Sequence, residues 1–182
     1  MILMMRILNF LILCTALLAQ PATAQLAKSS AISWIEAGII CASDTGEYRE
    51  APGTISGRAH APTEEPPFVS SSQVVPAVRG VGLGVKARSD ATIGMLPIEM
   101  ILTHPPMGED GITRQTFLSL ITPDRNAIIF FQFDHDYELV TGPWSFTAMR
   151  DGQTVFRANF QVVSPDEMPD LADTCDYRDL LS

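Results

Sequence analysis

The chain has 182 residues, of which 46% are hydrophobic and 18% are charged. This composition suits one globular domain and excludes a disordered or fibrous chain. Its 21 acidic residues outnumber its 12 basic residues and give a formal net charge of −9. Such a field repels nucleic acids and anionic lipid surfaces, so the composition excludes most DNA-binding and RNA-binding proteins.

The N-terminal segment has the three regions of a secretory signal peptide. Arg6 precedes an almost wholly apolar run over residues 7–18, and Ala22-Thr23-Ala24 provides the small residues of a cleavage site. The run is shorter than the roughly 20 apolar residues that span a bilayer. We therefore predict that residues 1–24 are a cleaved signal, and that the periplasmic or secreted mature protein keeps no membrane span. The alternatives are a membrane anchor and a lipoprotein joined to lipid through Cys14.

Signal cleavage would leave two cysteines, Cys41 and Cys175. An even pair in an oxidising compartment predicts a disulfide, with free thiols as the alternative. This bond would tie the two ends of the mature domain together. In the chain-entropy model, closing so long a loop stabilises a fold by about 4 to 5 kcal/mol.

Short apolar runs separated by Gly, Pro and Asp follow from Ser33 onward, a pattern typical of β-strands, and no long helical period is present. Pro76 marks its strand as an edge strand or a bulged one. Three prolines within residues 61–67 indicate a surface loop. The predicted strands, in chain order, are residues 34–42, 73–78, 81–88, 98–103, 115–121, 127–133, 144–149 and 154–163, with a short extended piece at residues 53–56.

Three connections between these strands are predicted from their turn residues. His104-Pro105-Pro106 should end the strand before it, because consecutive prolines remove backbone donors and force a turn. Residues 122–126 have the spacing of a hairpin loop. Asp151-Gly152 lies between two alternating segments and is a strong signal for a type I′ hairpin turn.

The strands around Asp151-Gly152 also supply the predicted core, since each has an apolar face at every second residue. Seven or eight strands in one domain predict an all-β fold, an antiparallel β-sandwich over residues 25–163 rather than a closed barrel. Gly142-Pro143-Trp144 at the start of a strand resembles immunoglobulin-type sandwiches, so the sandwich is expected to be immunoglobulin-like. Residues 164–182 are predicted to be an acidic C-terminal tail anchored by Cys175, with a short helix as the alternative. The predicted core residues are Trp144, Phe146, Ala148, Phe156, Ala158, Phe160 and Val162.

Three segments of the chain form a recognisable set: Thr103 to Gly108, Phe133 to Phe146, and Phe160-Gln161-Val162. Their most specific feature is the series Glu-Leu-Val, Gly-Pro-Trp-x-Phe and then Phe-x-Val. Together they resemble the bacterial DUF3859 family over about the last two thirds of the mature chain. The resemblance implies an exported, β-sandwich-like domain. It assigns no catalytic residue, because the family is a domain of unknown function.

Asp134-His135-Asp136 is the densest cluster of potential metal ligands. On a strand, the two carboxylates would share one side and His135 would face the other, so one ion could use all three only if the strand had ended. His104, at the end of another strand, is the candidate to complete a zinc site with His135 and an aspartate. We favour the alternative, a polar strand end whose carboxylates cap a turn, because no ligand-pair motif is present.

The main concentration of basic residues surrounds Gly80-Val81-Gly82-Leu83-Gly84, where Arg79, Lys86 and Arg88 lie close in sequence. No helix follows to provide an anion site at its N-terminus. We therefore predict a glycine-rich, bulge-prone strand with a solvated basic face rather than a phosphate-binding loop.

No nucleophile elbow or other catalytic motif is present. The sequence therefore predicts a small exported binding or interaction module without a cofactor, whose loops contact an unknown protein, glycan or envelope component. The alternative is a hydrolase or metal-dependent enzyme that uses His104, Asp134 and His135. The candidate binding residues are His104, Asp110, Asp134, His135, Asp136 and Tyr137.

Overall fold

A computed structural model of the chain describes residues 26–41, 46–171 and 175. The predicted signal peptide and the end of the acidic tail lie outside these residues. Nearly all regular structure in the described part is β-strand, with three short 3₁₀-helices. None of the helices in the described ranges is long and apolar enough to cross a bilayer.

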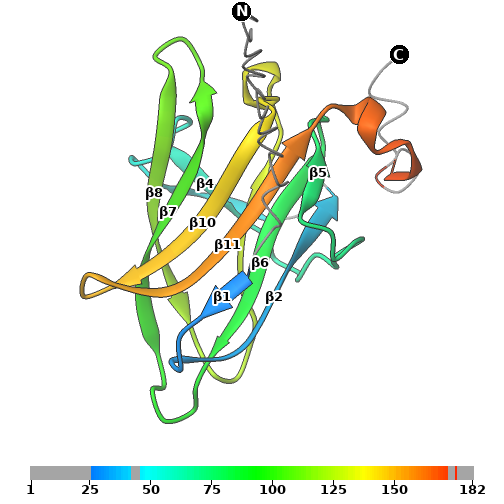
Figure 1. Cartoon of the computed structure of the whole chain (residues 1–182). Helices are drawn as coiled ribbons and strands as arrows, with labels where there is room; N and C mark the ends of the chain where they lie inside the picture. The colour runs from blue at the N-terminus through cyan, green and yellow to red at the C-terminus, as the bar shows by residue number, and fades with distance from the viewer. Residues whose placement is uncertain (1–25, 42–45, 172–174, 176–182) are drawn as a thin grey trace, which may run out of the picture.

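The larger sheet is antiparallel apart from one strand pair. The short strand β5 runs parallel to β11 and lies at the edge of the sheet, as expected for a strand that contains Pro76. Figure 1 shows this sheet, with β10 and β11 as its long central strands. In order, the sheet contains β1 (Leu26–Lys28), β11 (Gln153–Val163), β10 (Gly142–Arg150), β7 (Leu96–Met107) and β8 (Ile112–Ile121), with β5 (Val74–Pro76) beside β11.

The smaller sheet packs against the larger one and is antiparallel throughout. A separate hairpin of two short strands lies outside both sheets. The 3₁₀-helices are η1 (Asp136–Glu138), η2 (Pro165–Glu167) and η3 (Pro169–Leu171). The smaller sheet has the order β2 (Ile32–Cys41), β6 (Val81–Ser89) and β9 (Ala127–Gln132), and the hairpin consists of β3 (Glu47–Glu50) and β4 (Arg58–Ala61).

The predicted core is confirmed, because all seven of its residues are buried between the two sheets. Trp144 is at its centre, with its ring 5.1 Å from that of Phe131 and 5.7 Å from that of Phe133. The Trp144 indole N–H donates to the Val140 carbonyl at 3.1 Å. The tryptophan therefore joins β10 of the larger sheet to β9 and the segment that follows it.

The glycine-rich segment forms β6, as predicted, and its Val81, Leu83 and Val85 side chains enter the core. A Cβ atom at Gly84 would lie 2.7 Å from the Cβ of Phe130, so glycine is needed for β9 to pack this closely. The β6–β9 pairing is continuous. The irregularity in this sheet instead falls between β2 and β6, near Trp34.

The predicted solvated basic face holds for Arg79 and Arg88, which are exposed, but is wrong for Lys86. Lys86 is only 6% exposed, and its ammonium lies 2.8 Å from the Glu65 carboxylate and 4.7 Å from the centre of the Phe68 ring. The ion pair with Lys86 also lowers the pKa of Glu65. Because a covering segment supplies both partners, the strand pattern alone could not reveal this burial.

The prediction of a turn at His104-Pro105-Pro106 is wrong. These residues continue β7, and the chain turns at Gly108 and Gly111, both of which have positive φ. The β7–β8 pairing shifts register between Thr103 and Met107. Prolines fit this interrupted part of the ladder because they favour extended geometry and have no N–H to donate.

Two other connections differ from the prediction. Residues 122–126 carry the chain from β8 in the larger sheet to β9 in the smaller one and do not close a hairpin. A sheet-to-sheet crossing and a hairpin loop of this length look alike in sequence. Gly53 to Ser56 lies in the connection between β3 and β4, not in an extended segment. The β3 strand is exposed at every residue, so it has no apolar alternation to mark it.

The hairpin turn at Asp151-Gly152 is confirmed, with positive φ at both residues as a type I′ turn requires. The predicted disulfide is also present and joins Cys41, at the end of β2, to Cys175, with the two Cα atoms 5.2 Å apart. In the described part of the acidic tail, η2 and η3 follow β11. The bond therefore connects the tail to the smaller sheet.

Candidate functional site

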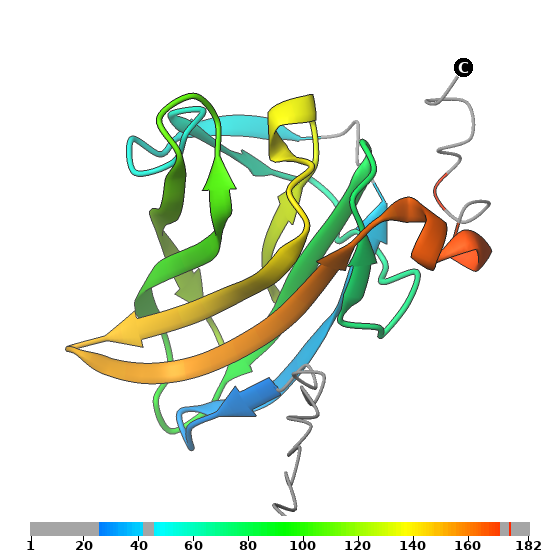
Figure 2. The ribbon, with the colours of Figure 1, turned by 45° about the horizontal axis from the view of Figure 1, so that its top comes forward.

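A cleft opens where the two sheets meet along β8 and β9. Each of these strands is an edge strand of its own sheet. The β3–β4 hairpin lies across the same end of the molecule as the β7–β8 turn and η1 (Figure 2). The hairpin, β8 and β9 line a cleft of about 700 Å³, and a smaller recess of about 120 Å³ shares part of its wall. We call this space the β8–β9 cleft; its volume lies in the range typical of ligand sites.

The hairpin is attached to the sandwich by two backbone contacts and a ring contact. The Thr116 N–H of β8 donates to the Gly53 carbonyl at 2.9 Å. A side chain at Gly53 would collide with the Thr116 carbonyl, so this close approach needs glycine. The His60 ring packs against the edge of Phe130 on β9, and Tyr48 stacks on His60. The hairpin therefore contacts both strands that flank the cleft.

Ile55 makes the second backbone contact of the hairpin, and a chain of hydrogen bonds from the core supports it. The Ile55 N–H donates to Gln115 Oε1 at 3.0 Å, and the Gln115 amide lies 3.0 Å from His104 Nε2. His104 Nδ1 lies 2.8 Å from the Pro105 carbonyl, which can only accept. Nδ1 must therefore carry the proton, Nε2 accepts from Gln115, and the ring is neutral. Both ring nitrogens are therefore occupied. His104 holds Gln115 in place beneath the hairpin and has no ring nitrogen left for a ligand.

Burial lowers the pKa of His104, and the bond to the Pro105 carbonyl only partly opposes this effect. The ring is 6% exposed and packs on Trp144 at 4.9 Å. Protonation would also make Nε2 a donor facing the donating amide of Gln115. Protonation at acid pH therefore weakens the bond between His104 and Gln115, the residue that holds Ile55.

Stability is expected to fall as the pH drops below 6.5, the ordinary pKa of histidine. The unfolded chain takes up a proton there, whereas folded His104 resists protonation until a lower pH. Urea unfolding at a series of pH values should show a smaller loss between neutral and mildly acidic pH for His104→Gln than for the wild type. Equal losses in the two proteins would contradict the role assigned to His104.

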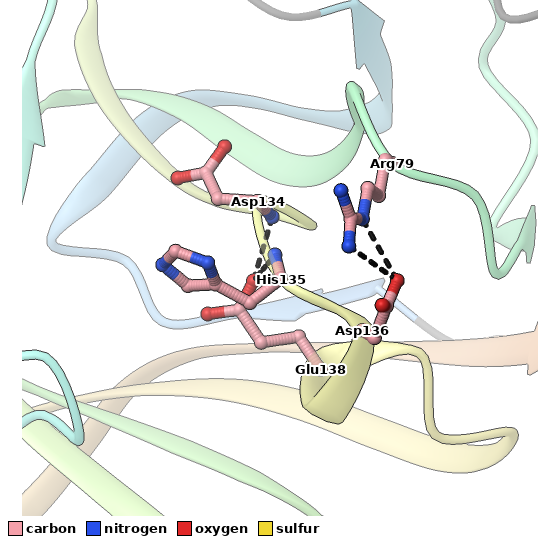
Figure 3. A network of polar contacts seen from close by, with 5 residues as sticks. All are labelled: Arg79, Asp134, His135, Asp136 and Glu138. Carbon is pink, nitrogen blue, oxygen red and sulfur yellow. Dashed lines mark hydrogen bonds and ion pairs between the residues drawn. The ribbon is translucent and has the colours of Figure 1, made fainter. Parts of the chain in front are cut away.

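The predicted ligand cluster Asp134-His135-Asp136 does not lie on a strand, because β9 ends at Gln132 and η1 begins at Asp136. Figure 3 shows the Asp136 side chain directed to Arg79, away from the side chains of Asp134 and His135. The Asp136 carboxylate lies 2.7 Å from the Arg79 guanidinium. Asp134 accepts from Gln132 at 2.7 Å. The three side chains therefore diverge into separate contacts.

Glu138, which the sequence analysis did not single out, organises this turn. One of its carboxylate oxygens accepts the backbone N–H groups of Asp134 and His135 at 2.6 and 2.8 Å. Burial raises the pKa of Glu138, while these two N–H donors oppose the rise. Asp134 and Glu138 both line the smaller recess. The alternation pattern missed Glu138 because its role depends on the 3₁₀ turn.

The remaining predicted residues lie at the rim of this end of the molecule. Asp110 is exposed in the turn between β7 and β8. Tyr137 is 39% exposed and stacks on His135 at 5.2 Å. Across the described residues, no group of three or more His, Cys, Asp or Glu side chains is placed to hold a metal ion. This geometry gives no support to an enzyme site built from His104, Asp134 and His135.

The fold and the cleft define the class of protein, a two-sheet β-sandwich with a ligand-sized cleft along one seam. The sequence profile of the DUF3859 family, a domain of unknown function, matches residues 28–162, and the chain belongs to this family. The match runs from the end of β1 to the end of β11. It therefore contains the smaller sheet, the hairpin and nearly all of the larger sheet.

The chain is also similar to a solved structure, an immunoglobulin-like protein from Pseudomonas aeruginosa. The sequence identity is 16% and the TM-score is 0.47, and the similarity covers 79% of this chain and 100% of the other. No curated protein matches the sequence.

Proposed function

We propose that the protein is an exported binding module that holds a partner from the cell envelope in the β8–β9 cleft. The observation that carries this proposal is the cleft itself, a ligand-sized space between two sheet edges that is partly covered by an anchored hairpin. Binding sites occur preferentially where a rigid scaffold presents loops and concave surfaces. The signal-like N-terminal sequence and the disulfide support export.

The charge around the cleft favours a partner without strong net charge. The ionised residues of the larger cleft are two arginines, Arg49 and Arg125, and two glutamates, Glu50 and Glu99. Their formal charges cancel, although the whole chain carries −9. The long strand β8 also exposes Leu118, which is 85% exposed, at this wall. A largely apolar contact with a neutral partner fits this surface.

Cross-linking capture from a periplasmic extract tests the proposal, with the mature chain starting at Gln25 as the bait. Leu118→Arg places a charge on the cleft wall and is expected to reduce partner capture at least tenfold. Met95→Arg is the matched control, because Met95 is 70% exposed and lies outside the cleft. Met95→Arg should capture as much partner as the wild type. Equal capture by Leu118→Arg, or no specific partner at all, would contradict the proposal.

A further inference from the structure

The backbone of β8 presents an open edge to the cleft. Thr116 directs its N–H away from β7 to Gly53. In a regular antiparallel strand, every second residue points its N–H and C=O to the same side. The β7–β8 register is continuous at this point, so Leu118 and Leu120 also direct their backbone groups to the open side. Within the described chain, the hairpin occupies this edge at Thr116 only.

Beyond Thr116, where the hairpin covers it, this edge has no protection against pairing in its sequence. Natural edge strands carry charges, prolines or bulges that prevent another strand from adding. Residues 115–121, Gln-Thr-Phe-Leu-Ser-Leu-Ile, contain no charged residue, proline or glycine. Leu118 and Leu120 lie on the same face of the strand, the spacing expected of apolar residues that pack on a partner, yet they are 85% and 42% exposed. An unprotected edge with an apolar face is the surface that an added strand requires.

The opposite wall offers a second row of backbone groups. Phe133 donates its N–H to Val81 of β6, so odd-numbered residues of β9 face the sheet. Ile128, Phe130 and Gln132 therefore direct their N–H and C=O groups to the seam. All three line the smaller recess. Hydrogen-bonding groups on both walls match a polypeptide backbone better than they match an apolar small molecule.

We propose that the open edge of β8 at Leu118 and Leu120 binds an extended, uncharged and partly apolar segment of a partner protein as an added β-strand. The proposal rests on the function proposed above, since it names the partner's chemistry at the same cleft. The backbone edge gives affinity and the exposed leucines select apolar side chains at alternate positions. The cancelling charges of the wall favour a segment without net charge.

A second copy of this chain fits the edge less well than a peptide does. Each copy carries a formal charge of −9, so two copies repel each other. In an antiparallel pair of β8 strands, the hairpin of each copy would already occupy the edge at Thr116. A free peptide can end before Thr116, whereas β8 of a second copy continues through Thr116 and brings its own hairpin to the same edge.

The test uses the mature protein and a short peptide of alternating Val and Thr, acetylated and amidated at its ends. NMR titration should show binding and slower amide hydrogen exchange at Leu118 and Leu120. The same peptide with N-methyl groups on alternate amides keeps its side chains but cannot complete the ladder. It should bind at least tenfold more weakly. Equal binding of the two peptides, or unchanged exchange at both leucines, would overturn the proposal.

Two substitutions of Leu118 test whether the open edge of β8 itself binds the peptide. Leu118→Pro removes an N–H that points to the open side, and proline is tolerated on edge strands, so peptide binding should be lost in a folded protein. Leu118→Lys adds an edge charge and gives the same test if the proline variant fails to fold. Retained peptide binding in a folded variant, or a dimer of free protein in sedimentation, would contradict strand addition.

The proposal can fail while the function proposed above survives. In that case partner capture would still depend on Leu118, but neither the peptide nor its N-methylated form would bind. A chito-oligosaccharide probe that binds and protects residues of the cleft would assign the site to a glycan instead. If Leu118→Arg leaves capture unchanged, both proposals fail together.

Discussion

Replacing both Cys41 and Cys175 by alanine is expected to lower the free energy of unfolding by about 4 to 5 kcal/mol. The bond links positions 134 residues apart, so it removes a large loop-closure entropy from the unfolded chain. The family match ends at residue 162, before Cys175, and both sheets are complete without the tail. The double variant should therefore fold to the same sandwich with lower stability. Urea unfolding followed by circular dichroism measures the loss.

A reduced wild-type protein is the matched control for this variant. Dithiothreitol should lower the stability of the wild type to about that of Cys41→Ala/Cys175→Ala and should leave the variant unchanged. Both alanine side chains remain apolar, and Cys175 packs only at the margin of the core. A loss below about 1 kcal/mol would mean that the unfolded chain is already compact, so that the chain-entropy account fails here.

The sequence predicted the parts of the fold that depend on local patterns. The β10–β11 hairpin was predictable because Asp151-Gly152 provides the positive φ angles of the turn and the flanking strands alternate cleanly. The connection over residues 122–126 was not predictable, because the length of a loop does not reveal which sheet the next strand joins. The β3 strand is exposed at every residue and β4 is at most half-buried, so no apolar alternation distinguishes this hairpin from a loop.

The candidate site was predictable only in outline. The segments around Asp110 and Asp134 are at the same end of the molecule, but the cleft wall depends on Gln115, Leu118 and the hairpin. His104 is the clearest example of the difference. Its place beside two prolines suggested a strand end, whereas its ring lies in the core and its bonds reach Ile55 through Gln115. Such a link joins distant segments and leaves no local signal.

Trp144→Ala is expected to lower the free energy of unfolding by about 3 to 5 kcal/mol, the usual cost of removing a buried tryptophan. Trp144 is 1% exposed and contacts the rings of His104, Phe131 and Phe133. The variant also leaves the Val140 carbonyl without its indole donor. Trp144→Phe should lose less, because it keeps a buried ring. Urea unfolding followed by far-UV circular dichroism compares the variants.

The second tryptophan provides the control, and the effect should extend to His104. Trp34→Ala is expected to cost less than about 1 kcal/mol, because Trp34 is only partly buried and contacts Arg88 at the surface. In Trp144→Ala, water entering the space beside His104 reduces the burial that lowers its pKa. The acid-induced loss of stability should therefore be smaller than in the wild type. An unchanged pH dependence would show that the Gln115 contact alone, and not the packing of Trp144, keeps His104 neutral.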